Sequence, residues 1–202
     1  RAGLPLVADG SRGRDRIRVV RDHADRHHDP DVAAEGAPIV KKPGGLELLF
    51  TKRTDTVEHH KGQISFPGGA AVETDASPAD TALRESSEEI GLDRSAVSIL
   101  GMMDDLQTPS GFIVTPVVGF IEQLPPLQIN SGEVAEVIFI PLELFFDDRK
   151  RHSKIIELNG TKREVYSFDV WREPVWGATA FFVKQLVDVV RNPQRNTRSK
   201  SH

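Results

Sequence analysis

Residues 67–91 constrain the fold most strongly, because they place a Pro-Gly-Gly turn shortly before a helix with well-defined ends. Ser77 suits the N-cap, Pro78 the first helical position, and Gly91 the C-terminal stop. The spacing therefore predicts a helix over residues 78–90. The glycines of the turn leave its backbone free to approach a ligand without obstruction by side chains.

The last two turns of this helix carry three acids, Glu85, Glu88 and Glu89. Positions three and four apart are neighbours on a helix, so we expect the three acids to share one face. That face differs from the one formed by Ala79, Leu83, Ser86 and Ile90. The helix dipole disfavours each acid there by about 0.3–1 kcal/mol. Arg84 can pair with Glu88, which leaves two acids uncompensated.

A solvated acidic face is one interpretation of this cluster, and a cation site is the other. A divalent cation would reverse the electrostatic penalty. Carboxylates without nearby His or Cys favour Mg²⁺ or Mn²⁺ over zinc.

The rest of the chain predicts an α/β fold, with a mixed sheet covered on both faces. Strands are expected at residues 46–53, 64–66, 97–106, 112–121 and 163–171. Residues 136–147 are expected to run from a strand into a helix that starts at Pro141, and residues 177–192 to form a last helix.

The ends of the chain differ from this central part. Residues 1–30 are charged and predict either a peripheral helix or a mobile arm, while residues 193–202 predict a disordered basic tail. We expect a single domain over residues 31–192.

Composition excludes several classes of protein. The net charge of −4 disfavours bulk nucleic-acid binding, and the absence of cysteine excludes disulfides and thiolate catalysis. The longest apolar run, residues 112–121, is about half the length of a membrane helix. No signal peptide is visible, so we expect a soluble, cytoplasmic protein without a membrane partner. The sequence is compatible with a monomer and with a homodimer.

Residues 68–92 resemble the Nudix box, which reads Gly, five residues, Glu, seven residues, then Arg-Glu-apolar-any-Glu-Glu-any-Gly-apolar. The matching residues are Gly69, Arg84, Glu85, Glu88, Glu89, Gly91 and Leu92. Asp75 replaces the first Glu, the next interval is eight residues long, and Ser86 stands at an apolar position. The resemblance implies a Nudix-type αβα sandwich that hydrolyses a nucleoside diphosphate derivative.

The residues before the box resemble the coenzyme A diphosphatase branch of that family. The matching positions are Thr51, Arg53, Gly62, Phe66, Pro67, Gly68 and Gly69. This implies cleavage of coenzyme A or acyl-CoA to phosphopantetheine and adenosine 3′,5′-bisphosphate. Thr54 and Glu58 depart from the branch pattern, and Glu58 reverses a charge. The alternative substrate is therefore ADP-ribose, a dinucleotide or a damaged nucleotide. A third hypothesis is that the protein is a nucleotide-sensing module without catalysis.

The resemblance also implies roles for individual residues. The predicted ligands of Mg²⁺ or Mn²⁺ are Gly69 through its carbonyl, Glu85, Glu88 and Glu89. Arg84 is expected to orient the acids, and either Glu85 or Glu133 to act as general base. The candidate substrate-binding residues are Arg53, His60, Gln63, Phe66 and Gly68.

Overall fold

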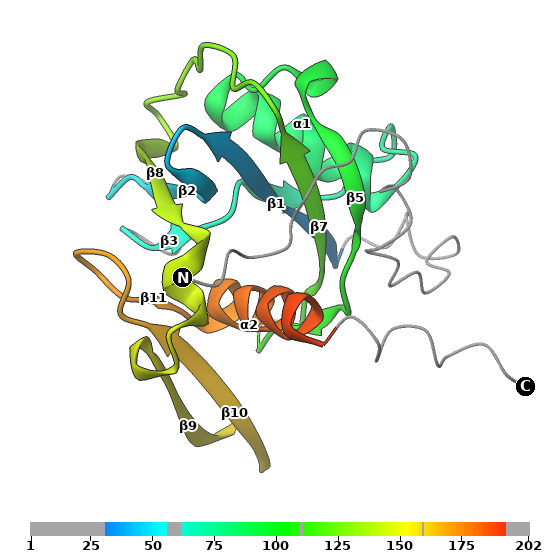
Figure 1. Cartoon of the computed structure of the whole chain (residues 1–202). Helices are drawn as coiled ribbons and strands as arrows, with labels where there is room; N and C mark the ends of the chain where they lie inside the picture. Colours follow the sequence, from blue (N-terminus) through cyan, green and yellow to red (C-terminus); the bar gives the residue numbers. More distant parts are fainter. Residues whose placement is uncertain (1–30, 56–61, 110, 159, 193–202) are drawn as a thin grey trace, which may run out of the picture.

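The computed structural model describes residues 31–55, 62–109, 111–158 and 160–192 (Figure 1). Some of the sequence-based expectations concern residues outside this part of the chain. These are residues 1–30 and 193–202, together with Glu58 and His60.

A mixed sheet of eight strands forms the centre of the molecule (Figure 1). Its strands are β1 Val32–Lys42, β2 Gly45–Arg53, β3 Ile64–Ser65, β4 Gly68–Ala70, β5 Ser98–Met102, β6 Leu106–Gln107, β7 Ile113–Ile121 and β8 Val134–Pro141. The main path is β3-β2-β1-β7-β5, while β4 pairs with β1, β6 with β7 and β8 with β2. In this sheet β1 and β7 run parallel and the other described pairs are antiparallel, so the predicted mixed sheet is confirmed.

The central strand β1 was not predicted from the sequence. Its residues are buried on both faces: Ala37 and Ile39 pack into one core cluster, whereas Ala34 and Val40 belong to clusters on the other side. A strand covered on both faces shows no apolar-polar alternation, and Glu35 interrupts its apolar run. The usual period-2 signal of a half-buried strand is therefore absent.

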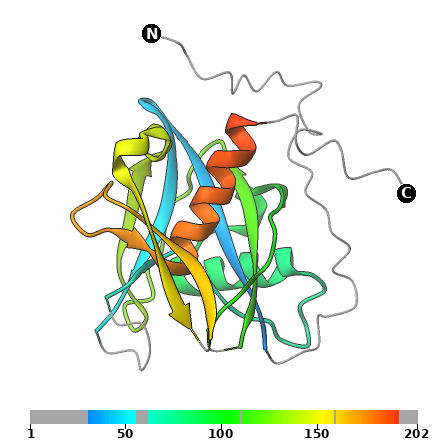
Figure 2. The same ribbon diagram turned by 90° about the horizontal axis from the view of Figure 1, so that it is seen from below.

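Two helices cover the opposite faces of the sheet, which confirms the αβα sandwich (Figures 1 and 2). Leu48 and Phe50 of β2 share a core cluster with residues of α2, Gly177–Arg191. Leu49 lies on the other face and clusters with Ile90 of α1, Pro78–Ile90. The alternation along β2 thus sends successive side chains to the two helical layers.

Helix α1 has the predicted ends. The Ser77 side chain accepts a hydrogen bond from the Asp80 N–H at 3.2 Å. Gly91 ends the helix in the left-handed region, with φ of 64°, and its N–H donates to carbonyls of the last turn. A Cβ at Gly91 would also lie 2.7 Å from Gln128, so both conformation and space require glycine there.

A second, antiparallel sheet lies beside α2 and consists of β9 Arg151–Leu158, β10 Thr161–Phe168 and β11 Val175–Trp176. The helix predicted from Pro141 is only a short 3₁₀ helix, η2 Leu142–Phe146. Further 3₁₀ turns are η1 Arg94–Ala96 and η3 Asp148–Lys150. No described helix is long and apolar enough to cross a membrane.

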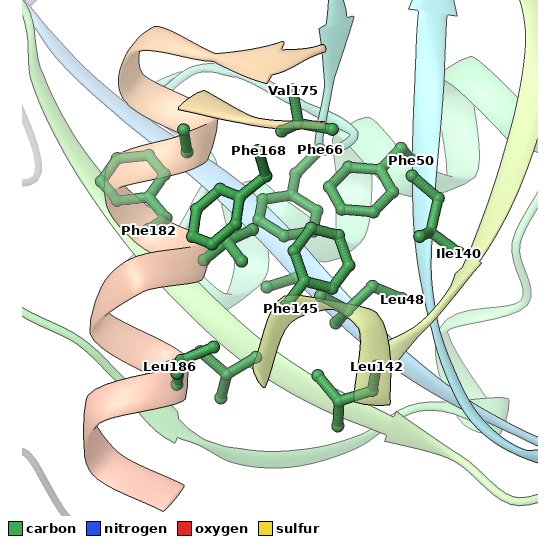
Figure 3. Close-up of a cluster of buried hydrophobic side chains, with 14 of the residues drawn as sticks. Leu48, Phe50, Phe66, Ile140, Leu142, Phe145, Phe168, Val175, Phe182 and Leu186 are labelled. Atoms are coloured by element: carbon green, nitrogen blue, oxygen red, sulfur yellow. The ribbon is translucent and has the colours of Figure 1, made fainter. Parts of the chain in front are cut away.

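The largest core cluster lies between the main sheet, η2, the second sheet and α2 (Figure 3). Five fully buried phenylalanines dominate it: Phe50, Phe66, Phe145, Phe168 and Phe182. Phe145 lies edge-on to Phe168, with ring centroids 5.4 Å apart, and 6.0 Å from Phe50. This arrangement joins the second sheet to the first through aromatic packing.

Candidate active site

Arg84 is the centre of a hydrogen-bonded network at the end of β4 and on α1. Its Nη1 donates to Glu85 Oε1 at 2.8 Å and to Glu88 Oε2 at 3.0 Å. Its Nη2 donates to the Ala70 carbonyl at 2.8 Å, and Nε and Nη2 both donate to Asp75 at 3.1 Å. The guanidinium is therefore fixed on several sides by charge-assisted hydrogen bonds.

Asp75 anchors this arginine from the loop before α1. It is 7% exposed and also accepts hydrogen bonds from the Val72 N–H at 3.1 Å and the Thr81 hydroxyl at 2.9 Å. Burial alone would raise the pKa of Asp75, but the hydrogen bonds from Arg84, Val72 and Thr81 lower it below its ordinary value. The residue that departs from the box pattern thus serves as a buried, ionised anchor.

Glu85 lies directly against the backbone of Gly69 in β4. A Cβ built on Gly69 would come within 2.5 Å of the Glu85 carboxylate, so a larger residue at position 69 would displace this acid. Burial raises the pKa of Glu85, against the opposing hydrogen bond from Arg84. The structure brings these two predicted cation ligands together.

The three acids of α1 are neighbours on the helix but differ sharply in burial, which the sequence did not predict. The Glu88 side chain is 57% exposed, whereas that of Glu89 is 5% exposed. Residues one position apart on a helix point about 100° from each other, and Glu89 turns inward beside the buried Ile90. Arg84 also pairs with Glu85 as well as Glu88, so the compensation is larger than the sequence predicted.

Glu89 is the most buried acid of the helix. The positive charge and the hydrogen-bond donors around it compensate its carboxylate only in part. Arg53 Nη1 lies 3.8 Å from its Oε1, and the Gly68 N–H donates a hydrogen bond to its carboxylate. Burial raises the pKa of Glu89 to about 8 in spite of the Arg53 charge. Its Oε2 is buried without a hydrogen-bond partner.

Glu35 of β1 belongs to this neighbourhood, and the sequence analysis missed it. Glu35 pairs in register with Gly68 of β4, and a Cβ on Gly68 would lie 2.7 Å from Glu35 Cα. Burial and then the charge of Glu89 raise the pKa of Glu35, Arg53 opposes both, and the resulting value is about 8. The available signal was a lone acid inside an apolar segment, which is unusual for a strand with two covered faces.

Two further predicted site residues, Glu133 and Gln63, lie near the residues described above. The negative charge of Glu133 raises the pKa values of Glu85 and Glu89, so Glu133 lies near both, and it accepts a hydrogen bond from Asn130 Nδ2 at 3.1 Å. The Gln63 carbonyl accepts from the Arg53 N–H at 3.1 Å, which joins β3 to the end of β2.

Phe66 has a different environment from the one expected. Its ring is 2% exposed and stacks on Phe50 with centroids 4.6 Å apart. This placement does not support the predicted substrate contact of the Phe66 side chain, because the ring offers almost no surface to a ligand.

The donor set suits a hard divalent cation chemically. It contains only carboxylate oxygens and the Gly69 carbonyl, and one of its oxygens, Glu89 Oε2, is buried without a partner. Among the described residues, no three His, Cys, Asp or Glu side chains form a group that could hold a metal ion as they stand. Arg84 and Arg53 pair with the acids of α1 instead.

Comparisons with known proteins agree with this geometry. The NUDIX domain model matches residues 32–158. A protein of Pectobacterium atrosepticum named uncharacterized Nudix hydrolase NudL is 39% identical over 159 residues, covering 79% of this chain and 82% of the relative. The protein of the same name from Photorhabdus laumondii is 35% identical over 159 residues, covering 79% of this chain and 84% of the relative.

A solved structure of a Nudix hydrolase from Listeria monocytogenes has the same fold. It aligns with a TM-score of 0.51 at 17% identity, over 80% of this chain and 94% of that one. The family match, the two relatives and the network of Arg84 together show that the chain belongs to the Nudix family and is a Nudix hydrolase, an enzyme of the class that acts on nucleoside diphosphate derivatives.

Proposed function

We propose that the protein is a Mg²⁺- or Mn²⁺-dependent diphosphatase whose substrate is coenzyme A or an acyl-CoA, cleaved to phosphopantetheine and adenosine 3′,5′-bisphosphate. The observation that carries the reaction class is the contact between the Glu85 carboxylate and the Gly69 backbone, beside the buried Glu89. Two carboxylates of α1 thus lie close to the backbone of β4. We also propose that residues 31–192 act as one domain, since α2 packs on the same core as β2.

Glu85, Glu89 and the Gly69 carbonyl are the proposed cation ligands, with Glu88 as the more exposed fourth candidate. A bound divalent cation would neutralise the diphosphate oxygens and lower the pKa of a water molecule. Arg84 is a positioning residue in this scheme, because its contacts are to Asp75, Ala70 and the acids themselves. Its fixed guanidinium keeps the Glu85 carboxylate against Gly69.

Two residues are candidates for the general base. Glu85 is the first choice, because it lies beside the Gly69 backbone and burial raises its pKa above the ordinary value, which favours proton acceptance. Glu133 is the second, because it lies on the loop before β8 and interacts electrostatically with Glu85 and Glu89. Because Glu85 is also a proposed cation ligand, the test is made on Glu133. Loss of hydrolysis in Glu133→Gln with retained Mn²⁺ binding identifies Glu133 as the base, and full activity of that variant leaves Glu85.

The substrate assignment depends on the segment before the box. Arg53 ends β2 beside Glu89, and its N–H is bonded to the Gln63 carbonyl, so the segment with the branch signature borders the acids. This position suits Arg53 for a phosphate group of the substrate. Glu58 reverses a charge of the branch pattern and motivates the alternative substrates, which are ADP-ribose, a dinucleotide or a damaged nucleotide.

The test is a hydrolysis assay with Mg²⁺ or Mn²⁺ on coenzyme A, an acyl-CoA, ADP-ribose and a dinucleotide, with products identified by mass. We expect the highest kcat/KM on coenzyme A or its acyl derivative, and a preference for ADP-ribose would reject this substrate. Glu89→Gln should lower kcat by about 100-fold or more. The matched control is Glu122→Gln, which changes an exposed acid paired with Lys41. Full activity of Glu89→Gln would reject the metal-dependent mechanism.

A further inference from the structure

Asn130 lies on the loop that joins β7 to β8, and the proposed function assigns it no role. Residues 122–133 of this loop are all described and form neither helix nor strand, so individual hydrogen bonds determine their shape. Each polar group of Asn130, in the backbone and in the side chain, takes part in one of these bonds.

The backbone of Asn130 joins the loop to the end of α1. Its N–H donates to the Glu89 carbonyl at 2.9 Å, and the Gln128 N–H donates to the Ile90 carbonyl at 2.9 Å. Carbonyls in the last turn of a helix have no partner within the helix, so the loop supplies their donors. Asn130 is thereby fixed to the residue that carries the most buried acid of α1.

The other end of this turn is attached to β2. The Thr54 N–H donates to the Glu133 carbonyl at 2.9 Å, and the Thr54 hydroxyl donates to the Gly132 carbonyl at 3.2 Å. Val134 pairs in register with Arg53. Glu133 therefore lies between the end of α1 and the end of β2, the two elements that the Arg53–Glu89 ion pair connects.

The side chain of Asn130 spans the turn and has two separable contacts. Its Oδ1 accepts a hydrogen bond from the Gly132 N–H at 3.1 Å, which stabilises the turn. Its Nδ2 donates to Glu133 Oε1 at 3.1 Å, which fixes the carboxylate. The oxygen thus shapes the backbone, and the amide N–H orients an acid.

The Glu133 carboxylate requires such a contact to keep its position. Glu133 is exposed, and the negative charges of Glu85 and Glu89 interact with its own. Like charges repel, and an exposed glutamate has many rotamers that point into solvent. Asn130 is a neutral donor, so it holds the carboxylate in place without neutralising its charge.

We propose that Asn130 is a positioning residue of the reaction, whose side-chain amide holds the Glu133 carboxylate beside the acids of α1. The inference rests on the proposed function, in which Glu133 is one of two candidate bases. It adds a residue outside the box that acts only through Glu133, and it requires that the Glu133 carboxylate takes part in the reaction.

The competing explanation is that Asn130 only shapes the loop. Asn130→Asp distinguishes the two explanations, because aspartate keeps the oxygen that accepts from the Gly132 N–H and loses the donor to Glu133. If Asn130 only shapes the loop, this variant keeps the wild-type kcat. Under our proposal, the Glu133 carboxylate loses its contact and kcat falls.

The experiment measures kcat and KM for the diphosphate that the wild type cleaves best, in Asn130→Asp, Glu133→Gln and the double variant. We expect kcat of Asn130→Asp to fall by about 10-fold. In the Glu133→Gln background, Asn130→Asp should cause no further loss, because the carboxylate on which Asn130 acts is already absent. Asn192→Asp makes the same change at the exposed end of α2 and should keep the wild-type kcat.

Three results would overturn the inference and leave the proposed function standing with Glu85 as the base. They are wild-type kcat in Asn130→Asp, full activity of Glu133→Gln, and an equal loss from Asn130→Asp with and without the Glu133 carboxylate. The last result would mean that the added charge acts directly on the substrate. If Asn130→Asp does not fold by circular dichroism, the neutral Asn130→Ser decides by the same cycle. A wild type that hydrolyses no diphosphate of the panel rejects the proposed function, and the inference with it.

Discussion

The two layers that cover the sheet differ sharply in composition. On the α2 side, the interface consists of large apolar side chains, with Phe50, Phe145, Phe168 and Phe182 all fully buried (Figure 3). On the α1 side, Ile90 and Pro78 are buried together with small or polar residues of the helix, which are Thr81, Ala82, Ser86 and Glu89. Both layers pack on the same strands, so the contrast does not follow from the sheet.

The difference separates stability from chemistry. A fully buried phenylalanine contributes about 1.5–3 kcal/mol of hydrophobic stabilisation, whereas a buried carboxylate opposes folding unless it is paired. The α2 side therefore stabilises the sandwich, and the α1 side contains the acids that the proposed reaction needs. Substitutions on the two sides should consequently affect different measurements.

The largest effect is expected on the α2 side, for Phe145→Ala. Phe145 is 1% exposed and lies between the rings of Phe50 and Phe168, so its loss leaves a cavity at the junction of the two sheets. We expect the free energy of unfolding to fall by about 3–5 kcal/mol in urea denaturation. Ile155→Ala, at a position 71% exposed, is the control and should change it by less than about 0.5 kcal/mol.

The same variant tests the separation of the layers. If the comparison is correct, kcat per folded molecule of Phe145→Ala stays at the wild-type level at low temperature. A large loss of kcat in fully folded protein would show that the α2 side takes part in the chemistry.

The next effect is expected on the α1 side, for Glu85→Gln. The change removes a proposed cation ligand and the first candidate base, so kcat should fall about 100-fold, which is about 2.7 kcal/mol in the barrier. The free energy of unfolding should change by less than about 1 kcal/mol, because the amide still fits against Gly69. Glu88→Gln, whose side chain is 57% exposed, should lose less activity than Glu85→Gln, and the reverse order would reject this ligand ranking.

Asp75→Asn should affect both measurements, because Asp75 anchors Arg84 and is itself buried. We expect a loss of about 2 kcal/mol in the free energy of unfolding at pH 7, together with lower activity. The pKa of Asp75 is lower in the folded protein than its ordinary value of 3.8, so its ionisation stabilises the fold.

The pH dependence of this loss follows from that direction. The stabilisation is fully present above about pH 5 and is lost as the pH falls below 3.8 through the lowered folded-state pKa. The difference between wild type and Asp75→Asn in urea denaturation should therefore shrink between pH 5 and pH 3. A constant difference over this range would contradict the role of Asp75 as an ionised anchor.

The same contrast explains what the sequence could predict. The ends of α1 were predictable, because Ser77, Pro78 and Gly91 act through local backbone geometry. The strand β2 was predictable from its apolar run after a turn. These signals depend on neighbours in the sequence, and tertiary contacts did not override them.

The parts that escaped prediction depend on contacts distant in the sequence. The strand β1 has covered faces on both sides, and the pairing of Glu35 with Gly68 joins residues 33 positions apart. The burial of Glu89 depends on Arg53 and on the β4 turn, which the helical pattern of α1 does not contain. The box could therefore indicate which acids are present, but not which of them the fold removes from solvent.

The smallest effect is expected for Ser86→Ala, at the box position where an apolar residue would be typical. Ser86 is 3% exposed, and its hydroxyl lies 3.3 Å from where a Cβ on Gly36 would be, beside a cavity of about 20 Å³. The variant loses the hydrogen bond from Ser86 Oγ to the Ala82 carbonyl at 2.7 Å, but that carbonyl keeps its helical partner. Alanine also has the higher helix propensity, so we expect a gain of no more than about 0.5 kcal/mol in the free energy of unfolding, with kcat unchanged. A loss above about 1 kcal/mol in urea denaturation would show that the polar α1 layer contributes to stability as well, and the separation between the two layers would then fail.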